Sequence, residues 1–215
     1  MNLLVTGGSG FIGREVCERA IDRGHDVTSV SRTGSPDHRE PWHDDVEWVA
    51  ADVFDPAAWR SRLDGCGAVV HSVGIIDESP PESTFERING DAGILVGLEA
   101  ERAGVERFVH FSAGVQPPFV REAYLDAKHR AERALAGLDF ALVVLRPGPV
   151  YGPDQPHFPP PVDRLFSLLD AAGPLAARLG NSRPLPVETV ARGALAGVEG
   201  SLTGTVEVPE LATYR

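Results

Sequence analysis

Short apolar segments alternate along the whole chain with longer segments whose apolar residues recur at helical spacing. The apolar runs predict strands at residues 3–6, 27–31, 46–50, 68–71, 107–112, 140–146 and 205–208. The amphipathic segments predict helices at residues 11–23, 56–63, 85–103, 121–136, 162–172 and 187–198. Strands that alternate with helices form a parallel sheet covered on both faces. We therefore expect an α/β protein with a doubly wound sheet of about seven strands.

Two proline-rich stretches interrupt this alternation. Residues 116–119 follow the fifth predicted strand, and residues 147–161 follow the sixth and contain seven prolines. Proline lacks a backbone N–H group, so we expect neither stretch to build regular elements. Loops at the carboxyl ends of strands commonly meet substrates in α/β folds. We expect a single domain over residues 1–215, with residues 147–215 as a small substrate-side appendage; a rigid connector is the other interpretation of the distal half of the loop.

Composition and charge exclude several classes of function. The two cysteines and seven scattered histidines show no disulfide framework and no metal-ligand spacing, so we expect no metal site. The net charge of −11 argues against nucleic acid as a partner, because phosphate binding needs a basic patch. No run approaches the length of a membrane span, and the N-terminus leads directly into a strand. We therefore expect no membrane span and a cytoplasmic location.

Residues 3–13, LLVTGGSGFIG, have the pattern of a buried strand, a glycine-rich turn and the start of a helix. Two spacings fit: Gly8, Gly10 and Gly13 match G-x-G-x-x-G, and Gly7, Gly10 and Gly13 match G-x-x-G-x-x-G. In both, the first glycine makes the tight turn, Gly10 admits a pyrophosphate and Gly13 lets the helix pack on the strand. The helix N-terminus then binds the anion. The expected dinucleotide contacts are Gly7, Gly8, Ser9, Gly10, Phe11, Ile12 and Gly13.

The end of the second predicted strand bears on the choice of cofactor. An NAD site usually has a carboxylate there for the ribose 2′-hydroxyl, but this chain has Ser31 and Arg32. Arg32 can pair with a 2′-phosphate, helped by Ser31, which favours NADP over NAD. Asp52 and Val53, after the third strand, stand where a carboxylate commonly meets the adenine amino group. A purely structural role for Asp52 beside the predicted helix start at residue 56 is an equal alternative.

A candidate catalytic set lies in the second half of the chain. Tyr124 and Lys128 form Y-x-x-x-K on a predicted helix, which puts both on one face, and Ser112 ends the fifth strand. An ammonium beside a phenol lowers the phenol pKa toward the working range. Lys128 is the single lysine among 20 basic residues, so an exposed surface lysine is the weaker interpretation. We expect Tyr124 to act as acid and base, Lys128 to tune it, and Ser112 to hold the substrate oxygen.

In combination and order, these motifs resemble the extended and atypical short-chain dehydrogenase/reductases of the epimerase/dehydratase group. The resemblance adds the segment 146–152, RPGPVYG, and covers nearly the whole chain. It implies a Rossmann fold, with Pro147 and Val150 beside the nicotinamide. Ser72, Val73 and Gly74 would line the cofactor, Lys128 would bond its ribose, and Asn89 would support the active-site water network.

The chain departs from the sugar-nucleotide members of this group, which carry a larger C-terminal substrate domain. In this respect it is more similar to the NADPH-binding accessory subunit of respiratory complex I and to oxidoreductase-like proteins associated with ubiquinone synthesis. Two hypotheses follow. The first is an enzyme that moves hydride to or from a carbonyl or alcohol carbon of a small-molecule substrate. The second is a non-catalytic NADP(H)-binding module associated with a respiratory complex or quinone system. In either case we expect a monomer or homodimer.

Overall fold

The computed structural model describes residues 1–37, 40–116, 120–156 and 159–214. Its centre is a parallel sheet of seven strands in the order β3-β2-β1-β4-β5-β6-β9. The strands are β1 (Asn2–Thr6), β2 (Asp26–Ser31), β3 (Val46–Ala50), β4 (Ala68–His71), β5 (Arg107–Phe111), β6 (Ala141–Arg146) and β9 (Gly204–Glu207). Each lies within one residue of its predicted range. The doubly wound α/β prediction is confirmed.

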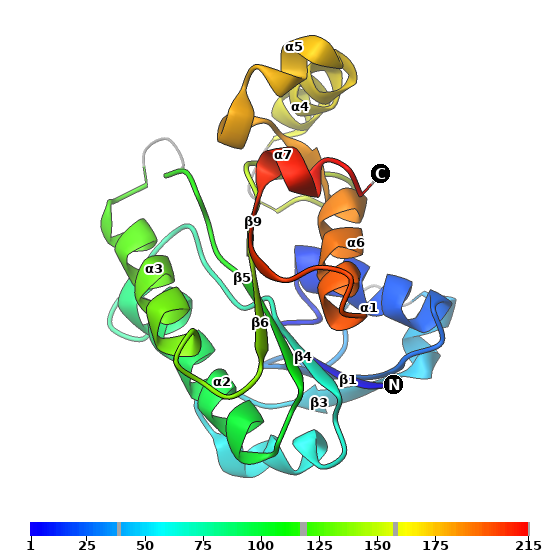
Figure 1. Ribbon diagram of the computed structural model, residues 1–215, viewed down its shortest axis with the longest axis vertical. Coiled ribbons are helices and arrows are strands. Elements are labelled where there is room, and N and C mark those ends of the chain that lie inside the picture. The colour runs from blue at the N-terminus through cyan, green and yellow to red at the C-terminus, as the bar shows by residue number, and fades with distance from the viewer. Residues whose placement is uncertain (38–39, 117–119, 157–158, 215) are drawn as a thin grey trace.

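Helices cover both faces of the sheet. Helices α1 (Phe11–Asp22) and α6 (Val187–Val198) pack on one face, and α2 (Ala92–Arg102) and α3 (Ala123–Leu135) pack on the other (Figure 1). Successive residues of a strand point to opposite faces, so Leu3 of β1 joins the core under α1 and α6. Leu4 joins the core under α2 instead. Burial on both faces fits the largely apolar sequences of the central strands β1, β4 and β6.

Two predicted helices differ from the structure. The segment predicted at 56–63 forms two short 3-10 turns, Pro56–Ala58 and Arg60–Leu63. Trp59 separates the two turns, and its fully buried indole donates a hydrogen bond to the Val53 carbonyl (3.3 Å). The helix predicted at 85–103 begins with a π-helical segment, Glu86–Asp91, before α2. In both places tertiary packing sets the local backbone, which a periodicity argument does not include.

The longer proline-rich stretch contains regular structure at two points, so the expectation of none was wrong there. Strand β7 (Val150–Tyr151) pairs in parallel with β8 (Leu185–Pro186). Helix α4 (Pro160–Ala171) starts on prolines, which are tolerated in a first turn because its N–H groups have no helical acceptor. Most of the shorter stretch, residues 117–119, lies outside the described residues.

The remaining short elements lie in the connections and after β9. They are the 3-10 turns Pro41–Asp45 and Gly180–Ser182, α5 (Pro174–Ala177) and α7 (Val208–Leu211). Figure 1 shows α4 and α5 beyond the edge of the sheet where β9 ends and α7 begins. That edge is the carboxyl edge, where the candidate site residues gather. In the described part of the chain, no helix is both long and apolar enough to cross a membrane.

Candidate functional site

The glycine-rich turn joins β1 to α1 at the carboxyl edge of the sheet. Gly7 has φ of +82°, a conformation that favours glycine, and its N–H donates to the Val30 carbonyl (2.8 Å). A Cβ on Gly13 would lie 2.2 Å from the Gly7 oxygen, so only glycine lets α1 approach β1 this closely. A Cβ on Gly8 would lie 2.3 Å from Ser29 Oγ. Gly7 therefore makes the turn, and Gly8 packs against β2.

The first turn of α1 forms a cradle suited to a phosphate. Its N-cap, Gly10, is exposed and brings no side-chain cap. A Cβ there would meet a single neighbour within 4 Å, the Gly7 oxygen at 3.2 Å. The amides of Phe11, Ile12 and Gly13 lack helical acceptors, as at every helix N-terminus, and the helix dipole favours an anion beside them. The turn fits the pyrophosphate of a dinucleotide.

A hollow of about 530 Å³ lies beside the turn. Ser9 of the turn and Thr33 after β2 line it, with their hydroxyls 3.3 Å apart. Arg14 lies in the same hollow and donates to Asp154 Oδ2 (3.0 Å). The rest of the lining is Pro36, Asp37 and Glu40. Arg14 was not predicted as a site residue. Its position could have indicated it, because it follows the last glycine of the motif and lies in the first turn of α1.

At the end of β2, the two predicted cofactor residues lie in different environments. Ser31 is buried, and its hydroxyl donates to the Gly34 carbonyl (2.6 Å), which closes the turn after the strand. Arg32 is exposed, and within the described residues its guanidinium makes no hydrogen bond or ion pair. Arg32 is therefore the cation available to a ligand at this strand end, whereas the Ser31 hydroxyl already donates its proton to the backbone.

Asp52 and Val53 lie after β3. Asp52 is exposed, and its Oδ1 accepts a hydrogen bond from the Phe54 N–H (2.9 Å), so one carboxylate oxygen stabilises its own turn. This contact is the structural role given as the alternative for Asp52, and the second oxygen can still meet a ligand. Val53 is buried in the core under α2. The predicted adenine contacts of both residues stay predictions.

The loop after β4 lies directly against the glycine-rich turn. Both the N–H and the hydroxyl of Ser72 donate to the Thr6 carbonyl, at 3.0 and 2.8 Å. A Cβ on Gly7 would lie 3.0 Å from Ser72 Oγ and 3.1 Å from the Val73 nitrogen. The two loops predicted to line the dinucleotide are therefore in contact with each other.

Asn89 fixes the next residues of this loop. Its side-chain oxygen accepts from the Ile75 N–H (2.8 Å), and its amide nitrogen donates to the Ile75 carbonyl (2.9 Å). Asn89 thus clamps the backbone of this loop, and its support of a water network stays a prediction. Gly74 lies between this clamp and α3, because a Cβ there would be 3.1 Å from Lys128 Nζ.

Lys128 is buried, with 5% of its surface exposed, which rules out a surface lysine. Its Nζ donates to the Phe111 carbonyl at the end of β5 (2.8 Å). Burial lowers the pKa of Lys128 to about 8, and the charge of Glu132 opposes this effect. The rings of His71 and His110 are stacked in the same interior, with their centroids 5.6 Å apart. Burial and the charge of Lys128 lower the pKa of His71 to about 3 and lower that of His110 as well, so both are neutral near pH 7.

Tyr124 shares the buried face of α3 with Lys128, as the Y-x-x-x-K spacing predicted. Tyr124 is 8% exposed, and its ring packs edge-on against Phe85, with ring centroids 5.6 Å apart. Burial raises the pKa of Tyr124 to about 12. Within the described residues its hydroxyl makes no hydrogen bond. The phenol is thus protonated at neutral pH and surrounded by apolar side chains.

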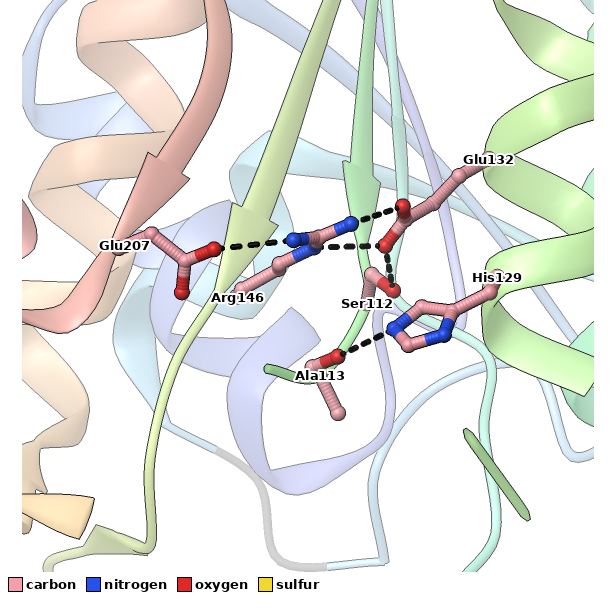
Figure 2. A network of polar contacts seen from close by, with 6 residues as sticks. All are labelled: Ser112, Ala113, His129, Glu132, Arg146 and Glu207. Carbon is pink, nitrogen blue, oxygen red and sulfur yellow. Dashed lines mark hydrogen bonds and ion pairs between the residues drawn. The ribbon is translucent and has the colours of Figure 1, made fainter. Parts of the chain in front are cut away.

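Ser112 belongs to a polar network that the sequence did not reveal (Figure 2). Its hydroxyl donates to Glu132 Oε1. Arg146, at the end of β6, donates to both oxygens of Glu132, at 3.0 Å from Nε and 2.5 Å from Nη2. The same guanidinium donates to Glu207 Oε1 (2.9 Å) at the end of β9. The available signal was Glu132, which follows Lys128 by one turn of α3.

The loop after β6 packs against the segment before α6. The Leu185 N–H donates to the Pro149 carbonyl (2.9 Å), and a Cβ on Gly148 would lie 2.6 Å from the Arg183 oxygen. Val150 is buried in this packing. Pro147 and Val150 therefore belong to an anchored loop at the carboxyl edge of the sheet. Their contact with nicotinamide stays a prediction.

Comparisons with known proteins agree with this geometry. The sequence model of the NAD(P)H-binding family matches residues 7–158. An uncharacterised chloroplastic protein of Arabidopsis thaliana is 38% identical over 70% of this chain, and the match spans 51% of that protein. MIOREX complex component 2 of Saccharomyces cerevisiae is 28% identical over 68% of this chain and 71% of its own length.

A solved structure shows the same fold. UDP-glucuronic acid 4-epimerase from Bacillus cereus, in complex with NAD, matches with a TM-score of 0.70 and 19% identity over 97% of this chain and 77% of its own. The cytoplasmic location stays a prediction, since one of the relatives is chloroplastic. The sheet order, the glycine turn and the family match together show that the chain belongs to the NAD(P)H-binding family, with NAD(P) as its cofactor and the Rossmann-type fold of the epimerase/dehydratase proteins.

Proposed function

We propose that the protein is an enzyme that transfers hydride between NAD(P) and a carbonyl or alcohol carbon of a small-molecule substrate. Bound NAD(P) supplies or accepts the hydride. Tyr124 exchanges a proton with the substrate oxygen, and Ser112 contacts the same oxygen. Lys128 holds the nicotinamide ribose and favours the phenolate form of Tyr124.

The burial of Lys128 is the observation that carries this proposal. Taking an ammonium out of water is costly, and this chain places its single lysine inside the protein, at the end of β5. The hydrogen bond to the Phe111 carbonyl points the ammonium toward the carboxyl edge, and a Cβ on Gly74 of the cofactor-side loop would lie 3.1 Å from it. A structural need for a cation would be met as well by arginine, which the chain uses everywhere else.

As an acid and base, Tyr124 needs a lower phenol pKa than burial gives it. Burial alone sets its pKa at about 12, so the phenol needs a nearby positive charge to exchange protons at neutral pH. Lys128 lies one turn further along the same buried face and is the cation best placed to supply it. Catalytic contacts often shorten only when cofactor and substrate are bound. We propose that binding brings the ammonium and the phenol together.

For the cofactor we propose NADP, with NAD as the alternative. Arg32 is exposed at the end of β2, where a 2′-phosphate would lie, and has no partner among the described residues. Arg14 is a second cation, which lines the hollow beside the glycine-rich turn and is paired with Asp154. Asp37, Glu40 and Asp154 make the hollow acidic, so discrimination depends on these two arginines.

A non-catalytic NADP(H)-binding module is the second candidate. It is favoured by the pKa of Tyr124, which burial raises, and by the Ser112 hydroxyl, whose proton is already donated to Glu132. The yeast relative is named as a component of a complex, which is compatible with a module that works within a larger respiratory or quinone-linked assembly. In this case Tyr124 is a packing residue.

A substrate screen separates the two candidates. The purified protein is mixed with NADPH or NADP⁺ and, in turn, cyclohexanone, cyclohexanol, decylubiquinone or UDP-glucose, while the absorbance of reduced nicotinamide is followed. The enzyme proposal expects turnover with one of these, and a loss of about 10²-fold or more in Tyr124→Phe. Tight NADPH binding without turnover supports the module. A substrate turned over equally by Tyr124→Phe removes Tyr124 from the mechanism.

A further inference from the structure

The proton between Ser112 and Glu132 belongs to the serine. Burial works to raise the pKa of Glu132, but hydrogen bonds from Arg146 and Ser112 outweigh it, so the pKa lies below its usual value and the carboxylate is ionised. An ionised carboxylate only accepts hydrogen bonds, so the hydroxyl must donate. A serine has one such proton. Ser112 is therefore left with lone pairs to offer to any other group.

We propose that Glu132 is a positioning residue of the reaction site, which fixes the Ser112 hydroxyl as a hydrogen-bond acceptor toward substrate and keeps a negative charge beside Lys128. The inference rests on the proposed function for the substrate role of Ser112. It assigns the substrate form that Ser112 recognises on binding: the alcohol, whose single O–H donates to Ser112 first and then turns to Tyr124, the group that takes its proton. In the opposite direction, the substrate carbonyl takes its proton from Tyr124 alone.

Three strands and one helix hold Glu132 in place. Ser112 follows β5, Arg146 ends β6 and Glu207 ends β9, while Glu132 reaches them from α3 (Figure 2). Arg146 contacts both carboxylates, so it keeps one charged partner when the other is neutralised. His129 lies on the same side of α3 and bonds the Ala113 carbonyl (3.3 Å).

Lys128 is the second residue through which Glu132 acts. The titratable groups whose charges interact with its ammonium are His71 on β4, His110 on β5 and Glu132 on α3, and Tyr124 shares the buried face of the same helix. Both histidines and the phenol are neutral near pH 7, for the reasons given above. Glu132 is therefore the charged member of this set, and it favours the ammonium form of Lys128.

Two matched variants test the charge effect. Glu132→Gln and Glu207→Gln each remove one negative charge from Arg146, and each leaves Arg146 one carboxylate. Only the first touches Ser112 and acts on Lys128. Because the chain contains a single lysine, [ε-¹³C]lysine labelling gives one side-chain signal whose pH titration reports Lys128 directly.

We expect a titration midpoint near 8 in the unaltered protein and in Glu207→Gln, and a midpoint about one pH unit lower in Glu132→Gln. Glu132→Asp keeps the charge and should stay near the unaltered value, and Glu132→Met is a second neutral variant with the same expected shift if Glu132→Gln does not fold. An unchanged midpoint in Glu132→Gln, or an equal shift in Glu207→Gln, overturns the inference. This measurement needs no substrate, so it can fail or succeed separately from the proposed function.

The acceptor role of Ser112 is tested on a substrate found in the screen. Glu132→Asp shortens the side chain by one methylene and releases the Ser112 proton, so kcat/KM should fall by about tenfold while the lysine titration does not move. Ser112→Ala should cause a similar loss, and the double variant should be no worse than either single one. Additive losses show that the two residues act separately and overturn this assignment. An absence of any substrate counts against the proposed function, and the lysine titration still decides the inference.

Discussion

Replacing Lys128 with methionine should remove a pH-dependent cost of folding. Methionine has a similar length and an apolar chain, so it suits the interior in which Lys128 lies. The pKa of Lys128 is lowered from 10.5 to about 8 by burial. Between these pH values the unfolded chain binds more protons than the folded one, so the free energy of unfolding rises with pH. Below about pH 8 both forms carry the charge, and the full cost is present.

The expected size follows from the shift. A change of 2.5 pKa units corresponds to about 3 kcal/mol at pH 7, of which about 1.4 kcal/mol remains at about pH 9.5. The unaltered protein should therefore gain about 2 kcal/mol relative to Lys128→Met between these two pH values. Loss of the bond to the Phe111 carbonyl is independent of pH and cancels in this comparison.

Urea unfolding of both proteins at the two pH values measures this difference. The buried cysteines, whose pKa values burial raises, also titrate in the unfolded chain near pH 9, but they do so equally in both proteins. His71 and His110 have lowered pKa values, so they reduce stability only as the pH falls below about 6.5, outside the range compared. A stability difference between the two proteins that stays constant within about 0.5 kcal/mol would refute a desolvated Lys128.

Three further predictions concern the cofactor site and the catalytic set. Gly13→Ala would bring a Cβ within 2.2 Å of the Gly7 oxygen, so NADPH affinity in fluorescence titration should fall sharply; a folded variant with full affinity would show that the turn does not hold the dinucleotide. Arg32→Ala should weaken NADPH binding by about 1.5–3 kcal/mol and leave NADH binding nearly unchanged in calorimetry; equal losses for both would exclude a 2′-phosphate contact. Tyr124→Phe should leave NADPH affinity unchanged, because the phenol is proposed to act on substrate, and a large loss of affinity would contradict that placement.

Much of the architecture followed from local pattern. The seven strands and the helices at α1, α3 and α6 were predicted nearly to the residue, because short apolar runs mark strands buried on both faces and a period of 3.6 marks the buried side of a helix. The glycine motif also follows from the chain itself, since its requirement is a backbone conformation. The helix predicted at 56–63 was wrong because of Trp59. A local pattern does not show that its indole will enter the core and interrupt a helix.

Spacing and composition alone are enough to predict the doubly wound sheet, the turn at Gly7 and the special role of the single lysine, Lys128. The assembled fold is needed to show that the Ser112 proton goes to Glu132, and that Arg146 joins this carboxylate to Glu207. These groups come from four elements far apart in the chain. Their protonation depends on burial and on charges that become neighbours only when the strands and α3 are assembled, and no local pattern contains that information.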